Sequence, residues 1–96
     1  MKHFVVIAQD PTVLQQNAIM SHVIEGKYAY WHWISNTWLL KDPNFYPQDS
    51  AGTLRDKIKA AAPGLIFIAF EVQPTDWGAF SDPKWAEWLE EHWKQH

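Results

Sequence analysis

The stretch Tyr28-Ala-Tyr-Trp-His-Trp-Ile-Ser-Asn-Thr-Trp-Leu-Leu40 decides the fold of this chain. It contains three of the seven tryptophans and two of the three tyrosines. Aromatic and β-branched residues favour strands, and the Ser35-Asn36 pair favours a tight turn. We therefore expect a β-hairpin with strands over Lys27–Ile34 and Thr37–Leu40. Both faces of this hairpin carry bulky side chains.

The segment before the hairpin predicts a strand followed by a helix. His3–Gln9 is almost continuously apolar, as in a central strand that is buried on both faces. Asp10 suits the N-cap of a helix and Pro11 suits its first turn. We expect this helix to end with Glu25 and Gly26. Its predicted core face carries Val13, Leu14, Asn17, Ala18, Met20 and Ile24.

The second half of the chain repeats the helix-to-strand order. A helix capped by Ser50 or Asp49 is predicted to end near Ala62, before the breaker pair Pro63-Gly64. A strand follows over Leu65–Val72. The cap signal before Pro83 then predicts a third helix running towards Lys94, with Trp85, Leu89 and Trp93 on one face.

The order strand, helix, strand, strand, helix, strand predicts an α+β fold. We expect residues 1–96 to form a single domain, a ferredoxin-like βαββαβ sandwich with a C-terminal helical tail. In this arrangement the first and third strands are central. Right-handed crossovers place the first two helices on one face of the sheet.

The other face of the predicted sheet needs a cover, because it carries several large apolar side chains. Exposing so much apolar area is unusual for a soluble monomer. We therefore predict a homodimer in which the two sheets face each other or share an edge. The alternative is that the Trp-rich tail folds back over the face within the same chain.

Composition restricts the function classes. The chain has no cysteine, so it has no disulfide and no thiolate metal site. It has no apolar run of about 18 residues and no signal-peptide cleavage pattern, so we expect a cytoplasmic protein that does not enter membranes. The net charge of −3 argues against a large nucleic-acid footprint, because such footprints need a basic excess.

The run from Tyr30 to Leu40, which follows a strand-Asp-helix opening, resembles the SinR-like branch of one known family. That family includes the second CRISPR-associated protein and the VapD toxins. The later segment Trp77-Gly-Ala-Phe80 is also similar. The resemblance implies a ferredoxin-like homodimer and metal-dependent cleavage of phosphodiesters in RNA or DNA, in defence or mobile-element biology. It further implies that an Asp from each subunit converges at the dimer interface, and Asp10 is the matching residue.

Asp10 and His32 are the candidate site residues. The Asp10 carboxylate suits Mg²⁺, which polarises a phosphate and activates water. The alternative is that Asp10 only caps the first helix. His32 suits a general acid or base tuned by burial. Its alternative is a packed histidine that is hydrogen-bonded to a neighbour.

Three functions therefore stay open, and the sequence alone leaves open whether the chain is an enzyme. The first is a dimeric, Mg²⁺-dependent nuclease that relies on Asp10. The second is a non-catalytic dimeric module that binds or inhibits a protein partner. The third is a dimeric α/β-barrel enzyme acting on a small molecule, with His32 as the base. A pocket beneath His32 would support this third function, whereas a filled sheet face would argue against it.

Overall fold

Seven helices and strands follow one another in the part of the chain that the structure describes. The computed structural model describes residues 2–42, 50–74, 77–78 and 82–93. Its elements are β1 (His3–Ala8), α1 (Val13–Glu25), β2 (Ala29–Trp31), β3 (Thr37–Lys41), α2 (Ala51–Ala61), β4 (Phe67–Val72) and α3 (Pro83–His92). The fold is thus mixed α+β, as expected. Three expectations fall partly outside the described residues: Asp49 as a helix cap, the end of the third helix at Lys94, and the last two residues of the segment Trp77-Gly-Ala-Phe80.

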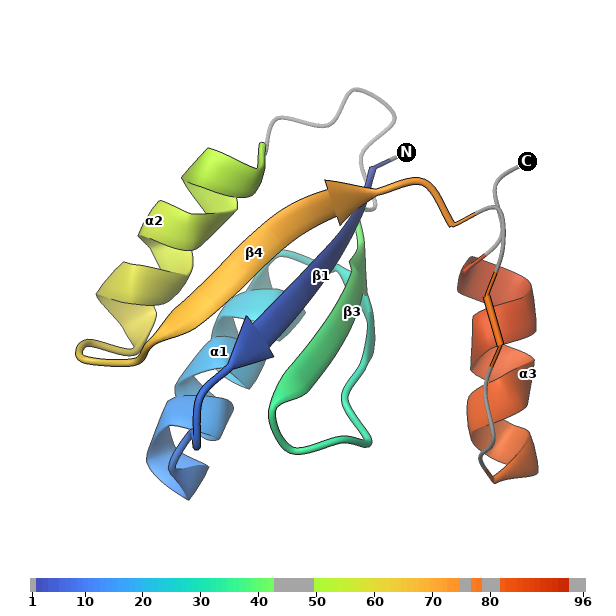
Figure 1. Ribbon diagram of the computed structural model, residues 1–96, viewed down its shortest axis with the longest axis horizontal. Helices are drawn as coiled ribbons and strands as arrows, with labels where there is room; N and C mark the ends of the chain where they lie inside the picture. Colours follow the sequence, from blue (N-terminus) through green and yellow to red (C-terminus); the bar gives the residue numbers. More distant parts are fainter. Residues whose placement is uncertain (1, 43–49, 75–76, 79–81, 94–96) are drawn as a thin grey trace.

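The strands form one antiparallel sheet in the order β2-β3-β1-β4. The first and third strands are therefore central, as predicted, and β2 and β4 lie at the edges. Val6 is the middle of the sheet, since its Cα partners are Trp38 on one side and Ala69 on the other. Figure 1 shows α1 and α2 on one side of the sheet and α3 on the opposite side.

The core lies between the sheet and the pair α1 and α2. Its buried members are Phe4, Val6 and Ala8 of β1, Ile19 and Val23 of α1, Trp38 and Leu40 of β3, Leu54 and Ile58 of α2, and Tyr28 and Ala62, which follow α1 and α2. Period-2 alternation places the β1 and β3 residues on one face, and i,i+4 spacing does the same on each helix.

The predicted core face of α1 is wrong. Val13 and Leu14 are 70% and 80% exposed, and Ile24 is also exposed. The helix instead buries the stripe of Ile19 and Val23. Apolar residues surround α1 on several sides, so its pattern does not select one face. The contact with the sheet selects the stripe.

The opposite face of the sheet is partly covered by α3. Trp31, Leu89 and Trp93 are buried there, packed against Val5 and Leu39 of the sheet and against further side chains. The Trp85, Leu89 and Trp93 face of this helix was predicted correctly. The tail thus folds back over part of the sheet within the same chain. Ile7, Ile68 and Phe70 on this face stay exposed.

The His3 side chain on β1 contacts the C-terminal end of α3. Its Nε2 lies 3.0 Å from the backbone oxygen of His92, and its ring meets the Trp93 ring edge-on at 5.1 Å. Burial lowers the pKa of His3 below its ordinary value of 6.5, and the positive charge of Lys41 acts in the same direction. The hydrogen bond to His92 opposes this change and raises the pKa of His3.

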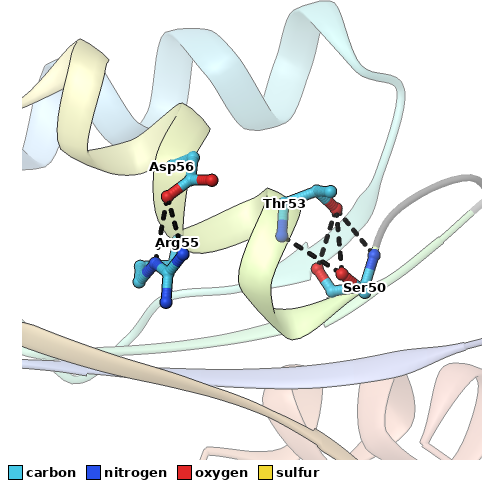
Figure 2. A network of polar contacts seen from close by, with 4 residues as sticks. All are labelled: Ser50, Thr53, Arg55 and Asp56. Carbon is cyan, nitrogen blue, oxygen red and sulfur yellow. Dashed lines mark hydrogen bonds and ion pairs between the residues drawn. The ribbon is translucent and has the colours of Figure 1, made fainter.

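The helix ends that were predicted at Ser50 and at Gly26 are both present in the structure. Ser50 caps α2 as predicted: Thr53 N donates to Ser50 Oγ, and Ser50 N donates to Thr53 Oγ1 (Figure 2). Gly26 ends α1, but its φ is −76° and Lys27 takes the positive φ of 59°. Gly26 is needed for space, because a Cβ there would lie 2.7 Å from the Tyr28 ring.

No helix in the described part of the chain is long and apolar enough to cross a membrane.

Candidate functional site

Three segments meet at the end of β1. Ala8 N donates to Asn36 O of the β2–β3 turn at 2.8 Å, and Gln9 N donates to Ile66 O ahead of β4 at 2.8 Å. Asp10 follows directly. The end of the central strand therefore lies between the hairpin turn on one side and the α2–β4 connection on the other.

Asp10 does not cap α1, so the capping interpretation is wrong. The N-cap is Thr12, in a capping box with Gln15: Gln15 N donates to Thr12 Oγ1 at 3.1 Å, and Thr12 N donates to Gln15 Oε1 at 2.9 Å. An N-cap needs extended backbone, which Thr12 has at φ −68° and ψ 163°. Asp10 has φ 41° instead.

The Asp10 carboxylate is exposed at the mouth of a shallow cavity. This cavity of about 250 Å³ is lined by Gln9, Asp10, Gln15, Gly64, Leu65 and Ile66. Within the described residues, the carboxylate makes no hydrogen bond and no ion pair. A positive φ is uncommon outside glycine, although Asp tolerates it better than most residues, and such outliers gather at functional sites. With respect to the described part of the chain, Asp10 is therefore an unpaired carboxylate on a backbone with a positive φ.

His32 lies outside the hairpin strands, because β2 ends at Trp31. The predicted turn at Ser35-Asn36 is present, with Thr37 N donating to Ile34 O at 3.0 Å. The His32 ring stacks on Trp38 with a centroid distance of 4.0 Å and an interplanar angle of 7°. Its two nitrogens lie 2.8 Å from Thr37 O and 3.1 Å from Gln16 Oε1.

These contacts restrict what His32 can do. An acid or base must exchange a proton with a reactant, so one of the two contacts would have to break. The buried Trp38 ring fills the space beneath the imidazole, where the small-molecule enzyme alternative needs a pocket. His32 is thus placed as the packed histidine of the alternative interpretation.

Gln16 connects the two candidate residues. Its Oε1 faces His32 and its Nε2 donates to Pro11 O at 3.2 Å, one residue from Asp10. Asp10 and His32 therefore lie at the same end of the sheet. Thr12 was missed although Thr12-x-x-Gln15 is a capping-box signature. Gln16 carries no comparable signal, because its partners are distant in sequence.

The donors of one chain fit only part of a metal site. In residues 2–42, 50–74, 77–78 and 82–93, no group of three or more His, Asp or Glu side chains could hold an ion. The cavity offers oxygen donors from Asp10, Gln9 and Gln15. Mg²⁺ prefers oxygen ligands and takes only one or two carboxylates with several waters. Asp10 fits as one such ligand, and a second copy would supply another.

Exposed apolar side chains surround this end of the molecule. We call this set the apolar rim. It consists of residues before and after Asp10, at the hairpin turn and along the exposed face of β4: Ile7, Val13, Leu14, Trp33, Ile34, Ile66, Ile68 and Phe70. Ile24, at the other end of α1, is the remaining large apolar side chain that is exposed among the described residues.

Comparison with protein-family models, with curated proteins and with solved structures gives no match. The functional argument therefore rests on the residues of this chain.

Proposed function

We propose that this chain is a homodimeric, Mg²⁺-dependent phosphodiesterase acting on nucleic acid, with Asp10 of each subunit as the metal ligand. One observation carries the proposal: Asp10 is an exposed carboxylate with a φ of 41° at the end of the central strand, and it has no hydrogen bond or ion pair to any described residue. Its competing role as a helix cap is taken by Thr12.

The fold that we propose is ferredoxin-like. The element order through β4 and the antiparallel sheet order β2-β3-β1-β4 support it. The two helices on one face of the sheet support it as well (Figure 1). The helix α3 is then an addition that covers part of the other face.

The apolar rim is the surface that we propose for dimerisation. Its members are 38% to 80% exposed, and they present on the order of 900 Å² if each offers roughly 200 Å² when fully exposed. A stable interface buries about 800 Å² per partner. Two-fold dimers place the same surface of both subunits around the axis. Since the rim surrounds Asp10, such a dimer brings the two carboxylates together.

The proposed reaction is hydrolysis at phosphorus. The Asp10 carboxylates of the two subunits would hold the ion, and a bound Mg²⁺ would polarise a phosphate oxygen and lower the pKa of its bound water. The Asp10 pair supplies the negative charge that holds the ion. Gln9 and Gln15 line the same cavity, and we propose that their amide groups donate hydrogen bonds to the substrate.

The substrate contact is expected to be small. The net charge is −3, and Arg55 pairs with its neighbour Asp56 at 2.9 Å (Figure 2). A long duplex would need many phosphate contacts. We therefore propose a single-stranded or otherwise short target.

The test is cleavage of labelled RNA and DNA oligonucleotides with Mg²⁺ or Mn²⁺. Asp10→Asn keeps the shape and removes the charge, so we expect loss of at least a hundredfold in kcat. Asp56→Asn, another exposed carboxylate, is the matched control and should retain activity. Cleavage that survives Asp10→Asn, or that needs no divalent ion, would overturn the proposal.

A second candidate is a non-catalytic module that binds a protein partner. The extent of the apolar rim favours it, because the rim spans far more surface than the cavity needs. If the wild-type chain shows no cleavage, recovery of one defined partner complex that survives Asp10→Asn and is lost in Ile68→Lys would support this function. A complex that depends on Asp10 would count against it.

A further inference from the structure

The two edges of the sheet differ in how they are protected. At one edge, β2 is three residues long, and its Trp31 meets Trp85 of α3 edge-on with the ring centroids 6.2 Å apart. At the other edge, β4 runs for six residues and contains no proline and no lysine. All of its residues pair with β1 in one unbroken register, so β4 has no bulge. Proteins protect sheet edges with such devices, because an unprotected edge accepts another strand. We call the outer side of β4 the open edge.

The hydrogen bonds of β1 identify the backbone groups at the open edge. Gln9 N donates to Ile66 O at 2.8 Å. The direction of the bonds alternates along an antiparallel strand, so every second residue from Ile66 onward faces β1. The intervening residues of β4 direct their N–H and C=O groups outward: Phe67, Ala69 and Glu71. Within the described part of the chain, these backbone groups have no hydrogen-bond partner.

The two faces beside the open edge differ in chemistry. On the face away from α1 and α2, Ile68 and Phe70 are 58% and 38% exposed. On the helix face, α2 covers β4 (Figure 1). Arg55 and Lys59 are exposed and one helical turn apart, so they share a side of α2. Figure 2 shows Arg55 on the side of α2 that is turned away from α1 and thus towards the open edge.

We propose that the open edge binds an extended segment of a second protein as an added antiparallel strand. The outward backbone groups of β4 supply the ladder of hydrogen bonds, as in other cases of strand addition. Side chains alternate between the two faces of a strand. The segment therefore alternates apolar residues, which pack beside Ile68 and Phe70, with acidic residues, which face Arg55 and Lys59. This interaction goes beyond the proposed function and does not depend on Asp10.

A second copy of this chain fits the open edge less well than an acidic segment does. Pairing β4 with β4 around a two-fold axis places the two α2 helices side by side, so Arg55 and Lys59 of both copies face one another and repel. The same pairing sets the two β1 strands about 14 Å apart, which is three strand spacings. At that separation two Asp10 carboxylates cannot share an ion. The proposed dimer uses the face of the sheet instead and leaves the backbone groups of the open edge free.

Hydrogen exchange of the backbone amides, measured by NMR, tests the pairing. The probe is the synthetic peptide acetyl-Val-Thr-Val-Glu-Val-Glu-Val-amide. Its threonine lies opposite Glu71, which avoids a pair of like charges, and its two glutamates lie opposite Ala69 and Phe67. At saturating peptide we expect the amides of these three β4 residues to exchange about tenfold more slowly or slower still. The amides of Ile68 and Phe70 already face β1, so their exchange should change less.

Matched peptides separate the backbone contribution from the charge. In antiparallel pairing the glutamates of the probe turn their N–H groups towards β4. N-methylation of both glutamates should therefore abolish binding, whereas N-methylation of the two valines that precede them should not. Replacing both glutamates of the probe by lysine should weaken binding.

A pair of lysine variants tests the charge on α2. Lys59→Gln should weaken binding of the acidic probe about two- to fivefold, as for an exposed ion pair. Lys57 is also exposed on α2 but lies two residues from Lys59, on another side of the helix. Lys57→Gln should therefore leave the affinity unchanged.

Three results would overturn this inference. The first is unchanged amide exchange at Phe67, Ala69 and Glu71 with millimolar probe. The second is equal binding of the two N-methylated peptides, or of the glutamate and lysine peptides. The third is slower exchange of these amides as the protein concentration rises without peptide, which would place a second copy at the open edge. No readout involves Asp10 or cleavage, so a chain without nuclease activity would reject the proposed function and leave this test valid.

Discussion

Thr12 stabilises the start of α1, and Asp10 does not, although the two lie two residues apart. Thr12 exchanges two hydrogen bonds with Gln15, whereas Asp10 carries a positive φ. We expect Thr12→Ala to lower the free energy of unfolding by about 1 kcal/mol through loss of the cap. Asp10→Gly should keep or raise stability, since glycine adopts a positive φ without cost. Urea denaturation measures both, and a larger loss in Asp10→Gly than in Thr12→Ala would contradict the assignment.

His3 makes the stability of the fold depend on pH. Burial lowers its pKa in the native state below 6.5, so the unfolded chain binds the proton more readily than the folded chain. The stability that His3 contributes is therefore complete above pH 6.5 and is lost as the pH falls from there through the lowered pKa of the folded state. His3→Asn keeps a donor for the His92 carbonyl and removes the titration.

The matching measurement is thermal unfolding of both proteins between neutral and mildly acidic pH. The difference in Tm between wild type and His3→Asn should shrink as the pH falls. A constant difference across this range would show that burial of His3 has no part in the pH dependence.

At the scale of elements, α3 is held to the sheet by apolar packing. Leu89 is buried between Trp31 and Trp93, on the face of the sheet opposite α1 and α2. Leu89→Ala should cost about 2–4 kcal/mol of unfolding free energy, in the range of buried leucines. Leu54→Ala in the main core is the comparison. A loss below about 1 kcal/mol for Leu89→Ala alone would mean that α3 is not docked in solution.

Element order and local end signals could be predicted from the sequence. The Ser50 cap, the Ser35-Asn36 turn and the Trp85, Leu89 and Trp93 stripe each depend on residues close together in the chain. The core face of α1 could not be predicted, because apolar residues such as Leu14 and Ile24 are as hydrophobic as the buried Ile19. Packing against the sheet determines which face of α1 is buried.

The candidate site could be predicted only in part. Asp10 was identified by its position, but Asp10-Pro11 also fits a helix start, so its positive φ could not be inferred. His32 was expected within a strand, yet its ring leaves the ladder and meets Gln16 from α1. The hydrogen bonds of His32 and Gln16 join segments that are distant in sequence, and patterns in a single sequence do not report such contacts. A second copy was predicted to cover the sheet and the tail was the alternative; α3 covers part of this face, and the choice could not be made from the sequence because both offer apolar surface.

At the scale of the whole molecule, we propose that the apolar rim is the dimer interface. Ile68 in the rim and Ile24 on α1 are each 58% exposed, so they form a matched pair. We expect the wild-type chain to sediment as a dimer at micromolar concentration. Ile68→Lys should shift it to a monomer, because a charge in an apolar interface is costly, and Ile24→Lys should stay dimeric. If the wild-type chain is a monomer, or if Ile68→Lys and Ile24→Lys change the oligomeric state equally, the apolar rim is not the dimer interface.

The central claim is that two Asp10 residues meet across a dimer, and a disulfide crosslink tests it most directly. The chain has no cysteine, so Asp10→Cys introduces its single thiol, and Glu25→Cys at the other end of α1 is the control. A disulfide requires Cα atoms within about 7 Å, a separation that the two loops would reach in the proposed dimer. Mild oxidation should give a covalent dimer of Asp10→Cys on a non-reducing gel and leave Glu25→Cys monomeric. A monomeric Asp10→Cys, or equal crosslinking of both, would contradict a shared site.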